Sequence, residues 1–202
     1  GLRPINNVVD ITNYILHGVG QPLHSFDADK IKGNKVVVRS ATEGAKFVTL
    51  DGVERTLTDR DLMICNVEEP MCIAGVFGGL DSGVTEQTKN VFLESATFHP
   101  TQTVEVMKRA ALLIQEVAGG TITGAIQDIY PVPVAPYRVE LTYDKVNTLI
   151  GKVIPVETVK SILESLEMKI VSETAEGLVI DVPVYRIDVQ RDVDVIEDIL
   201  RI

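Results

Sequence analysis

The segment "YPVPVAP", residues 130 to 136, limits the possible folds of this chain more than any other stretch. Proline lacks the backbone N–H that an inner strand needs, and its ring fixes φ. Three prolines in seven residues can therefore neither continue a helix nor pair inside a sheet. We predict a linker here, with a boundary near residues 131 to 137. The expected domains are residues 1–130 and 137–202.

Upstream of the linker, the apolar spacing is first helical and then typical of strands. It predicts a helix over about residues 7 to 17, capped by Asn6 or Asn7. Residues 35 to 98 contain short β-rich runs, and Asp51-Gly52 is a strong signal for a two-residue hairpin turn. The stretch "TVEVMKRAALLIQEVAGG" returns to helical spacing and ends at a glycine pair. These patterns predict a mostly antiparallel sheet accompanied by helices.

Downstream of the linker, the pattern predicts a compact β-α-β unit followed by an acidic helix. A helix is expected in "PVETVKSILESLEM", strands in "KIVSE" and "GLVIDVPVY", and a last helix within "DVQRDVDVIEDILRI". The fold class expected for the whole chain is α+β.

Composition excludes some classes of function. The 202 residues include 19 Lys plus Arg against 29 Asp plus Glu, a net charge of -10. This is the wrong sign for a protein that grips nucleic acid through its phosphates alone, so any RNA contact must be local or shared with a partner. No apolar run approaches the roughly 18 residues of a membrane helix, and no leader is seen, so a soluble cytoplasmic protein is expected.

Two further features concern processing and redox state. A start on "GLRP" without Met indicates an excised fragment. Cys65 and Cys72 have a spacing that fits neither a redox pair nor a common zinc knuckle, so two buried, reduced thiols are expected.

Two stretches in the first domain combine features of a site. In "AGVFGGLDSGV" four glycines would let backbone N–H groups approach a ligand, although a tight turn without a ligand is an equal reading. Glu94 follows three apolar residues, where it either reaches solvent or waits for a hydrogen-bond donor. His24, in "GQPLHSFD", either takes part in chemistry or caps a loop.

The acidic tail carries a separate signal. Asp194, Glu197 and Asp198 have the spacing that places carboxylates on one helical face, and Asp188 lies just upstream. Such oxygen ligands suit Mg²⁺, which commonly keeps several of its waters. The alternative is that some of these acids meet the positive helix N-terminus and the rest are solvated.

Several motifs together carry a resemblance to a known family. The stretches "RPINNVVDITNYILHGVGQPLHSFD", "TLDGVERTL", "AGVFGGLDSGV" and "VFLESATFHP" resemble the B3/B4 region of the bacterial phenylalanyl-tRNA synthetase beta subunit. "VPVYRIDVQRDVDVIEDILRI", with the unit before it, resembles the adjoining B5 domain, here C-terminally truncated. The resemblance implies an α+β editing module with a mixed or antiparallel sheet, followed by a small winged-helix-like domain.

In that family the B3/B4 module hydrolyses tyrosine wrongly attached to the phenylalanine tRNA. The resemblance implies catalytic roles for His24, Glu94 and Asn13, and a substrate pocket lined by Thr12, Ala74, Gly75, Gly78 and Gly79. Glu94 would accept a hydrogen bond from the tyrosine hydroxyl, and His24 would orient the ribose or the attacking water. Backbone N–H groups near Gly75 to Gly79 could stabilise the oxyanion. Editing of this kind is expected to need no cofactor.

The resemblance also implies partners. The family holds Mg²⁺ with acids shared between beta and alpha subunits, which correspond to Asp188, Asp194, Glu197 and Asp198. The implied partners are tRNA(Phe) and the alpha subunit, in a heterotetramer of two alpha and two beta chains, with no DNA and no membrane. Asp198 departs from the glutamate usual there, and the shorter side chain would loosen that ligand.

One departure affects the expected activity. Near residues 100–104 the family's longer basic segment, which helps to wall the pocket, is missing: either it was deleted, or it is disordered and absent from the printed sequence. Without it the pocket would be open on one side. No ATP site is recognised, so aminoacylation is not expected of this chain. Two rival interpretations are a non-catalytic scaffold that docks subunits and tRNA, and a DNA-binding protein, which the acidic balance disfavours.

Overall fold

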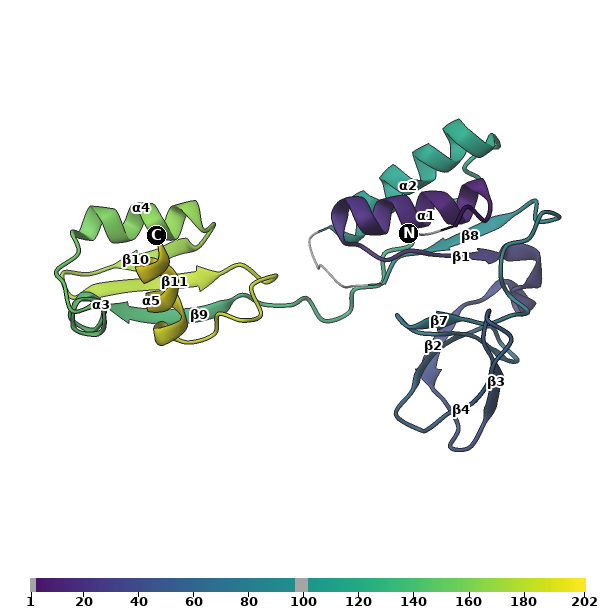
Figure 1. Cartoon of the computed structure of the whole chain (residues 1–202), viewed down its shortest axis with the longest axis horizontal. Coiled ribbons are helices and arrows are strands. Elements are labelled where there is room, and N and C mark those ends of the chain that lie inside the picture. The colour runs from purple at the N-terminus through teal and green to yellow at the C-terminus, as the bar shows by residue number, and fades with distance from the viewer. Residues whose placement is uncertain (1–2, 97–101) are drawn as a thin grey trace. The chain divides into compact units, whose positions relative to one another are not determined.

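The computed structural model describes residues 3–96 and 102–202, and its helices and strands form two compact units (Figure 1). The N-terminal unit is residues 1–128 and the C-terminal unit is residues 129–202. Part of the segment near 100–104 that sequence analysis expects to be shortened lies outside the described residues. No helix within the described ranges is both long and apolar enough to cross a lipid bilayer.

The N-terminal unit contains two long helices and several short antiparallel sheets. Strand β1 pairs with β8, β3 pairs with β4, and the largest sheet has the order β2-β5-β6-β7. The α+β class and the antiparallel pairing expected from sequence are confirmed. The elements of this unit are α1 (Asn7–Val19), β1 (His24–Asp27), the 3₁₀ turns η1 (Ala28–Lys30) and η2 (Lys32–Asn34), β2 (Val37–Ser40), β3 (Lys46–Val48), β4 (Glu54–Thr56), β5 (Leu62–Cys65), β6 (Pro70–Ile73), β7 (Phe77–Gly78), β8 (Val91–Glu94) and α2 (Thr103–Ala118).

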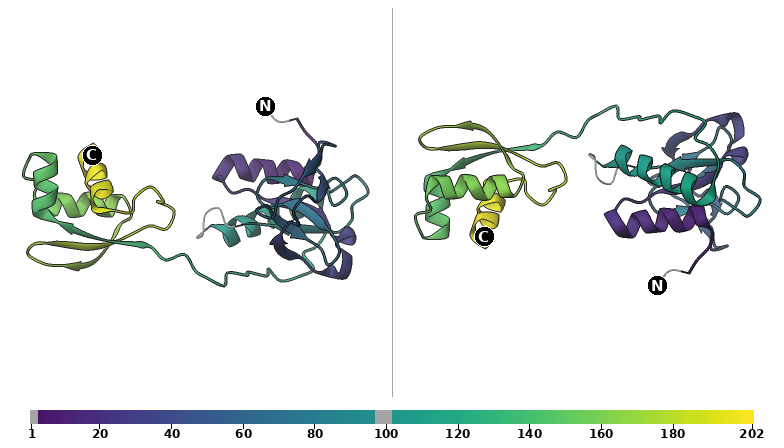
Figure 2. Two further views of the ribbon diagram at one scale, coloured as in Figure 1. Left: turned by 90° about the horizontal axis from the view of Figure 1, so that it is seen from below. Right: turned by 90° about the horizontal axis from the view of Figure 1, so that it is seen from above.

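Helix α1 begins where the sequence predicts it and ends two residues later than predicted. The side chain of Asn6 accepts a hydrogen bond from the backbone N–H of Val9 at 2.9 Å, so Asn6 rather than Asn7 is the cap. Gly20, in the left-handed conformation, ends the helix by donating to the Leu16 carbonyl. The apolar face of α1 packs beside α2, and the views in Figures 1 and 2 both place the two helices next to each other.

The two asparagines at this helix start allow a matched test. Asn6→Ala is expected to lower the free energy of unfolding by about 1 kcal/mol, because the Val9 N–H then loses its acceptor. Asn7→Ala, at an exposed position inside the helix, should cost nothing. Urea unfolding of both variants checks this, and equal losses would contradict the capping role of Asn6.

The hairpin between β3 and β4 turns at Asp51-Gly52, but its loop is longer than the predicted two residues. The Thr49 N–H donates to the Val53 carbonyl at 3.1 Å, which leaves three residues in the loop. The Asp51 carboxylate accepts from the Val53 N–H, and Gly52 has φ +77°. The two-residue prediction was therefore wrong. In a two-residue turn the Val53 N–H would donate to a backbone carbonyl, but here it donates to the side chain of Asp51.

The C-terminal unit is a three-stranded antiparallel sheet, in the order β10-β11-β9, with three helices. Thr142 caps a helix within the stretch "YRVELTYDKVNTLIG", for which the sequence pattern predicts no helix separate from the strand before it. The winged-helix likeness of this unit stays a prediction. Its elements are β9 (Tyr137–Thr142), α3 (Tyr143–Ile150), α4 (Val156–Ser165), β10 (Lys169–Glu173), β11 (Gly177–Val182) and α5 (Asp192–Arg201).

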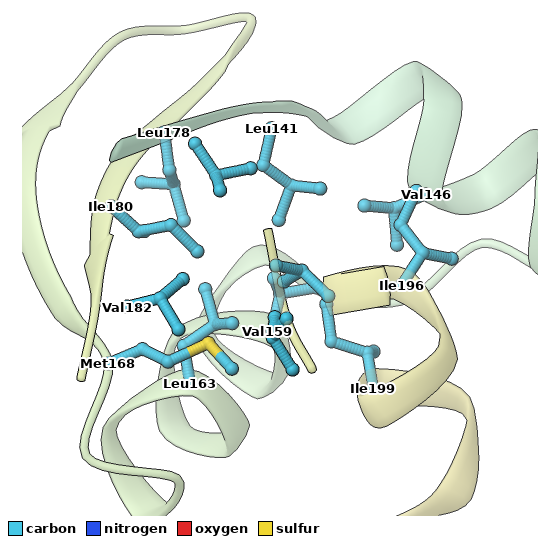
Figure 3. Packing of buried hydrophobic residues seen from close by; sticks show 13 residues of the cluster. Leu141, Val146, Val159, Leu163, Met168, Leu178, Ile180, Val182, Ile196 and Ile199 are labelled. Atoms are coloured by element: carbon cyan, nitrogen blue, oxygen red, sulfur yellow. The ribbon is translucent and has the colours of Figure 1, made fainter. Parts of the chain in front are cut away.

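Buried apolar side chains from all these elements except β10 form the core of the C-terminal unit (Figure 3). Helix α5 contributes Val195, Ile196 and Ile199, which lie at most 4% exposed. The acidic residues of α5 lie at the edge of this buried face or outside it: the side chains of Asp194 and Asp198 are 18% and 16% exposed, whereas that of Glu197 is 66% exposed. The orientation of α5 thus decides which of its acidic side chains are accessible to a ligand or partner.

Candidate functional site

Strands β1 and β8 bring the two residues singled out by sequence directly opposite each other. In the antiparallel register His24 pairs with Glu94, and Phe26 pairs with Phe92. Directly opposed residues project from the same face, with Cβ atoms about 5 Å apart. His24 therefore belongs to a strand rather than to a loop, and its side chain stands beside that of Glu94.

Gly78 completes the enclosure of His24. A Cβ atom at Gly78 would lie 2.5 Å from His24 Cε1, 2.8 Å from Nε2 and 2.8 Å from Leu50 Cδ1. The backbone of β7 thus approaches the imidazole as closely as a residue without a side chain allows. On another side, the Phe26 ring packs edge-on against the imidazole at 4.5 Å between centroids. We refer to His24, Glu94 and Gly78 as the β1–β8 site.

Burial keeps His24 uncharged. Desolvation lowers the pKa of its imidazole below the ordinary value, so the ring is neutral at pH 7. Its Nε2 atom is buried and has no hydrogen-bond partner among the residues that the structure describes. A buried polar atom without a partner costs free energy, and such atoms are common where a ligand or water completes the site.

Burial acts in the opposite direction on Glu94. Desolvation of the carboxyl group raises its pKa to about 7. Glu94 forms no ion pair within the described ranges, so no cation offsets this desolvation. Of the two alternatives left open by sequence, the structure does not place this carboxyl free in solvent. No hydrogen bond from another described residue reaches this carboxyl, so within that part of the chain it is an acceptor without a donor.

Cys72 is a neighbour of this site that sequence analysis did not select. It lies on β6 opposite Gly78, and burial, followed by the charge of Glu94, raises the pKa of its thiol to about 12. A thiol that stays protonated is a poor nucleophile, so thiolate chemistry is excluded here. Both cysteines are free and buried, which confirms the predicted reduced thiols. The sequence around the two cysteines predicts strands but does not indicate that Cys72 lies near Glu94.

The other small residues of the expected pocket have structural partners. The N–H of Gly79 donates to the Met71 carbonyl at 2.8 Å, and a Cβ there would lie 2.7 Å from that oxygen. Gly75 adopts a left-handed conformation, with φ +69°, in a turn closed by the Val76 N–H. Ala74 packs against the core cluster around Phe26. Within this set the close approach to His24 is made by Gly78.

Thr12 and Asn13 lie on α1. Thr12 is buried, and its hydroxyl donates to the Val9 carbonyl at 2.8 Å. Asn13 lines a surface hollow of about 490 Å³ together with Arg3, Pro4, Asp10, Tyr14, His17 and Gly18. That hollow does not include His24 or Glu94, and neither does a second cavity of about 550 Å³ that Gly79 helps to line. These contacts do not link Asn13 to the β1–β8 site.

The four acids expected to bind Mg²⁺ are each paired with an arginine. Arg186 contacts Asp188 and Asp198, whereas Arg191 pairs with Asp194, and Arg201 pairs with Glu197 at 3.4 Å. Asp194 also accepts from two backbone N–H groups at the start of α5, and these bonds, after that from Arg191, lower its pKa to about 2. Across the described residues, no three His, Cys, Asp or Glu side chains converge as metal ligands do. In this arrangement the acids do not fit a resident Mg²⁺.

Two families of domain match the chain. The B3/4 domain matches residues 1–119, and the tRNA synthetase B5 domain matches residues 139–202. A solved N-terminal fragment of the phenylalanyl-tRNA synthetase beta subunit from Pyrococcus horikoshii superposes with a TM-score of 0.50 at 19% identity, covering 99% of this chain and 67% of that one. At this identity the match shows the fold alone.

Curated relatives are much more similar in sequence. The phenylalanine–tRNA ligase beta subunit of Bacteroides fragilis strain ATCC 25285 is 61% identical, and that of Porphyromonas gingivalis strain W83 is 51% identical. Each match covers the whole of this chain and 28% of the relative, so the chain spans little more than a quarter of their length. The first match runs over 228 positions, 26 more than the 202 residues here, so that relative has extra residues within the matched region.

Proposed function

The chain belongs to the phenylalanine–tRNA ligase beta subunit family, whose B3/4 and B5 domains it carries, and from this premise we propose that its N-terminal unit edits tRNA. The reaction is hydrolysis of the ester that joins tyrosine to tRNA(Phe). The observation that carries the proposal is the pairing of His24 with an underpartnered Glu94 beside Gly78.

Glu94 supplies the selectivity in this proposal. Tyrosine and phenylalanine differ by one hydroxyl group, and the Glu94 carboxylate offers that hydroxyl an acceptor. A site built around such a hydrogen bond discriminates against the analogue lacking the hydroxyl by roughly 10⁴ to 10⁵, because its buried polar group is then left unpaired. A pKa of about 7 supports this role, since a sizeable fraction of Glu94 is ionised near neutral pH.

His24 positions the reacting groups. Its neutral ring and unpartnered Nε2 can form a hydrogen bond to the terminal ribose or to the attacking water. The oxyanion of the tetrahedral intermediate needs N–H donors, and two in the glycine-rich stretch are already engaged: those of Val76 and Gly79 donate to backbone carbonyls. Stabilisation of the oxyanion therefore falls to other donors around Gly75 and Gly78. Thr12 and Ala74 are proposed to support the outer wall of the site, whereas Asn13 lines a separate hollow and is given no part in this reaction.

The remaining parts of the proposed function depend on the whole enzyme. The relatives have extra residues within the matched region, and we propose that they correspond to the longer basic segment expected near residues 100–104, which would close the open side of the pocket. The C-terminal unit is proposed to dock the alpha subunit and tRNA within a cytoplasmic enzyme of two alpha and two beta chains. Mg²⁺ belongs to that whole enzyme, and no step of the editing reaction proposed here passes through it.

Deacylation of Tyr-tRNA(Phe) by the assembled enzyme tests the proposal. Glu94→Ala is expected to slow deacylation at least tenfold, because the phenol loses its acceptor, and His24→Ala should also slow it. Glu116→Ala, which removes an exposed acid of α2, should leave the rate unchanged. Phe-tRNA(Phe) serves as the substrate control. Unchanged rates in both site variants would instead favour a non-catalytic scaffold that docks subunits and tRNA.

A further inference from the structure

Strand β8 has a single strand neighbour where it carries Glu94. Within the described residues β8 pairs only with β1, and His24 with Glu94 is the end pair of this ladder. The end pair of a ladder opens more easily than the pairs inside it, because nothing beyond it closes the two strands. The place of Glu94 beside His24 therefore depends on what holds the chain just outside the strands.

Gln21 holds the chain at this point. Its side chain is 1% exposed, and its Nε2 atom donates to the Ala96 carbonyl at 2.6 Å, the Pro22 carbonyl at 3.2 Å and the Ser95 hydroxyl at 3.3 Å. Ser95 and Ala96 directly follow β8, whereas Pro22 lies just before β1. One buried amide group thus joins the two segments that leave the end pair of the ladder.

The contacts fix which side of the Gln21 amide faces these segments. The carbonyl oxygens of Pro22 and Ala96 can only accept hydrogen bonds, so the amide nitrogen must face them. The Oε1 atom is then turned away, where it is buried and has no partner among the residues that the structure describes. A buried polar atom without a partner lowers stability, and departures of this kind concentrate at functional positions. This favours a positioning role for Gln21 over a purely stabilising one.

Ser95 extends the contact to helix α2. Its hydroxyl donates to the carbonyl of Thr103, the first residue of α2, at 3.2 Å. Leu93 packs against the apolar cluster that α1 and α2 form, and side chains alternate between the two faces of a strand, so Glu94 points away from the helices. Gln21 and Ser95 therefore bond to the chain next to Glu94 and not to its carboxyl group.

We propose that Gln21 is a positioning residue of the β1–β8 site, whose amide holds the end of β8 so that the Glu94 carboxyl stays buried opposite His24. This inference rests on the proposed function, because it takes the reaction to depend on Glu94. Without the amide, the end pair of the ladder opens and Glu94 reaches solvent. The substrate hydroxyl then finds its acceptor displaced and hydrated.

Deacylation of Tyr-tRNA(Phe) by the assembled enzyme measures the effect on the reaction. Gln21→Met keeps the length of the side chain but has no N–H donor, and it is expected to lower kcat at least about tenfold. Gln115→Met, the same change at an exposed position of α2, is the matched control and should stay within about threefold. In a Glu94→Ala background Gln21→Met should cause no further loss, because Gln21 acts through Glu94.

Two kinetic outcomes would contradict the inference. One is a further loss of about tenfold when Gln21→Met is added to Glu94→Ala, since independent effects multiply. The other is a full rate in Gln21→Met when Glu94→Ala is slow. A full rate in Glu94→Ala itself would count against the proposed function, and the position of Glu94 is then decided by its ionisation.

The ionisation of Glu94 can be followed without tRNA. In the 202-residue chain the carboxyl carbon of Glu94 should titrate in ¹³C NMR with a pKa of about 7, because the group is buried. In Gln21→Met the pKa is expected to fall toward the ordinary 4.5 as the carboxyl reaches water, and in Gln115→Met it should not change. An unchanged pKa in folded Gln21→Met would sink the inference, whatever the deacylation rates.

Circular dichroism checks the fold of Gln21→Met. The variant is expected to fold, because it loses the unpaired Oε1 together with the Nε2 donor. If it does not fold, Ser95→Ala takes its place, since this change removes the link from Gln21 to α2 and keeps the bond to Ala96. The pKa of Glu94 should then fall in the same direction and deacylation should slow, and a pKa that does not move would again refute the role of Gln21.

Discussion

Glu94→Gln is expected to stabilise the N-terminal unit above neutral pH and to leave its stability unchanged in acid. In the folded chain the pKa of Glu94 is about 7, against an ordinary value of 4.5. Below the ordinary value the carboxyl is protonated in both the folded and unfolded states, so its charge costs nothing. As the pH rises toward 7 and beyond, the unfolded state ionises first, and stability is lost.

The size of the loss follows from the shift in pKa. One pKa unit corresponds to about 1.4 kcal/mol, so the glutamate costs up to about 3 kcal/mol above pH 8. Glutamine has nearly the same shape and carries no charge, and it avoids this penalty at every pH. The free energy of unfolding should therefore exceed that of the unaltered chain by up to about 3 kcal/mol at high pH, with a difference near zero at about pH 4.

Hydrogen exchange of the β1 and β8 amides measures this difference in the N-terminal unit alone. Variant and unaltered chain are compared at the same pH, so intrinsic exchange rates cancel. Glu116→Gln, which removes the same charge from an exposed position on α2, is the matched control and should show no such pH dependence. A stabilisation that is the same in acid and in alkali would mean that the Glu94 carboxyl is not desolvated.

Gly78→Ala is expected to slow deacylation of Tyr-tRNA(Phe) by about 100-fold, because a displacement of roughly 1 Å in a catalytic site has effects of this size. The new Cβ would lie 2.5 Å from His24 Cε1, so the imidazole has to move away. The atoms in the way belong to side chains, the ring of His24 and the end of Leu50, and not to backbone. The unit is therefore expected to stay folded.

Gly83→Ala distinguishes the effect of displacing Leu50 from the effect of displacing His24, the two side chains that a Cβ at Gly78 would meet. A Cβ at Gly83 would contact Leu50 Cδ2 at 3.1 Å and does not approach His24. It should leave deacylation within about threefold of the unaltered enzyme, since the geometry of the imidazole is kept. The NMR signal of the His24 ring should shift in Gly78→Ala and not in Gly83→Ala. A full deacylation rate in Gly78→Ala would show that the position of His24 does not matter for catalysis.

Much of the local structure could be predicted from sequence because local rules decide it. The helical spacing of apolar residues located α1 and α2, and the Asp51-Gly52 signal located the β3–β4 turn. The predicted loop length was wrong because the Asp51 side chain, rather than a backbone carbonyl, accepts the hydrogen bond from the Val53 N–H. The dipeptide Asp51-Gly52 does not by itself reveal which acceptor is used. The four-residue strand β1 was missed because its pattern is too short to show a period.

The acidic residues of α5 show the same division between what local spacing predicts and what tertiary folding decides. Helical spacing alone indicates that Asp194, Glu197 and Asp198 share one side of α5. The same spacing also allows Arg191 to reach Asp194 and Arg201 to reach Glu197. It does not indicate that Arg186 pairs with Asp198, because Arg186 lies 12 residues upstream and meets Asp198 only when the chain folds back. The choice between a metal and a guanidinium group depends on which cation that folding brings near.

The sequence by itself determined helices α1 and α2 and the residue types available for chemistry, since each of these follows from neighbours along the chain. Only the tertiary structure decided that His24 stands opposite Glu94, that Gly78 leaves room for the imidazole, and that Cys72 lies near the acid. The physical reason is that strand register and burial arise from contacts between segments distant in sequence. These contacts desolvate Glu94 and His24, and desolvation shifts the pKa of each toward its uncharged form.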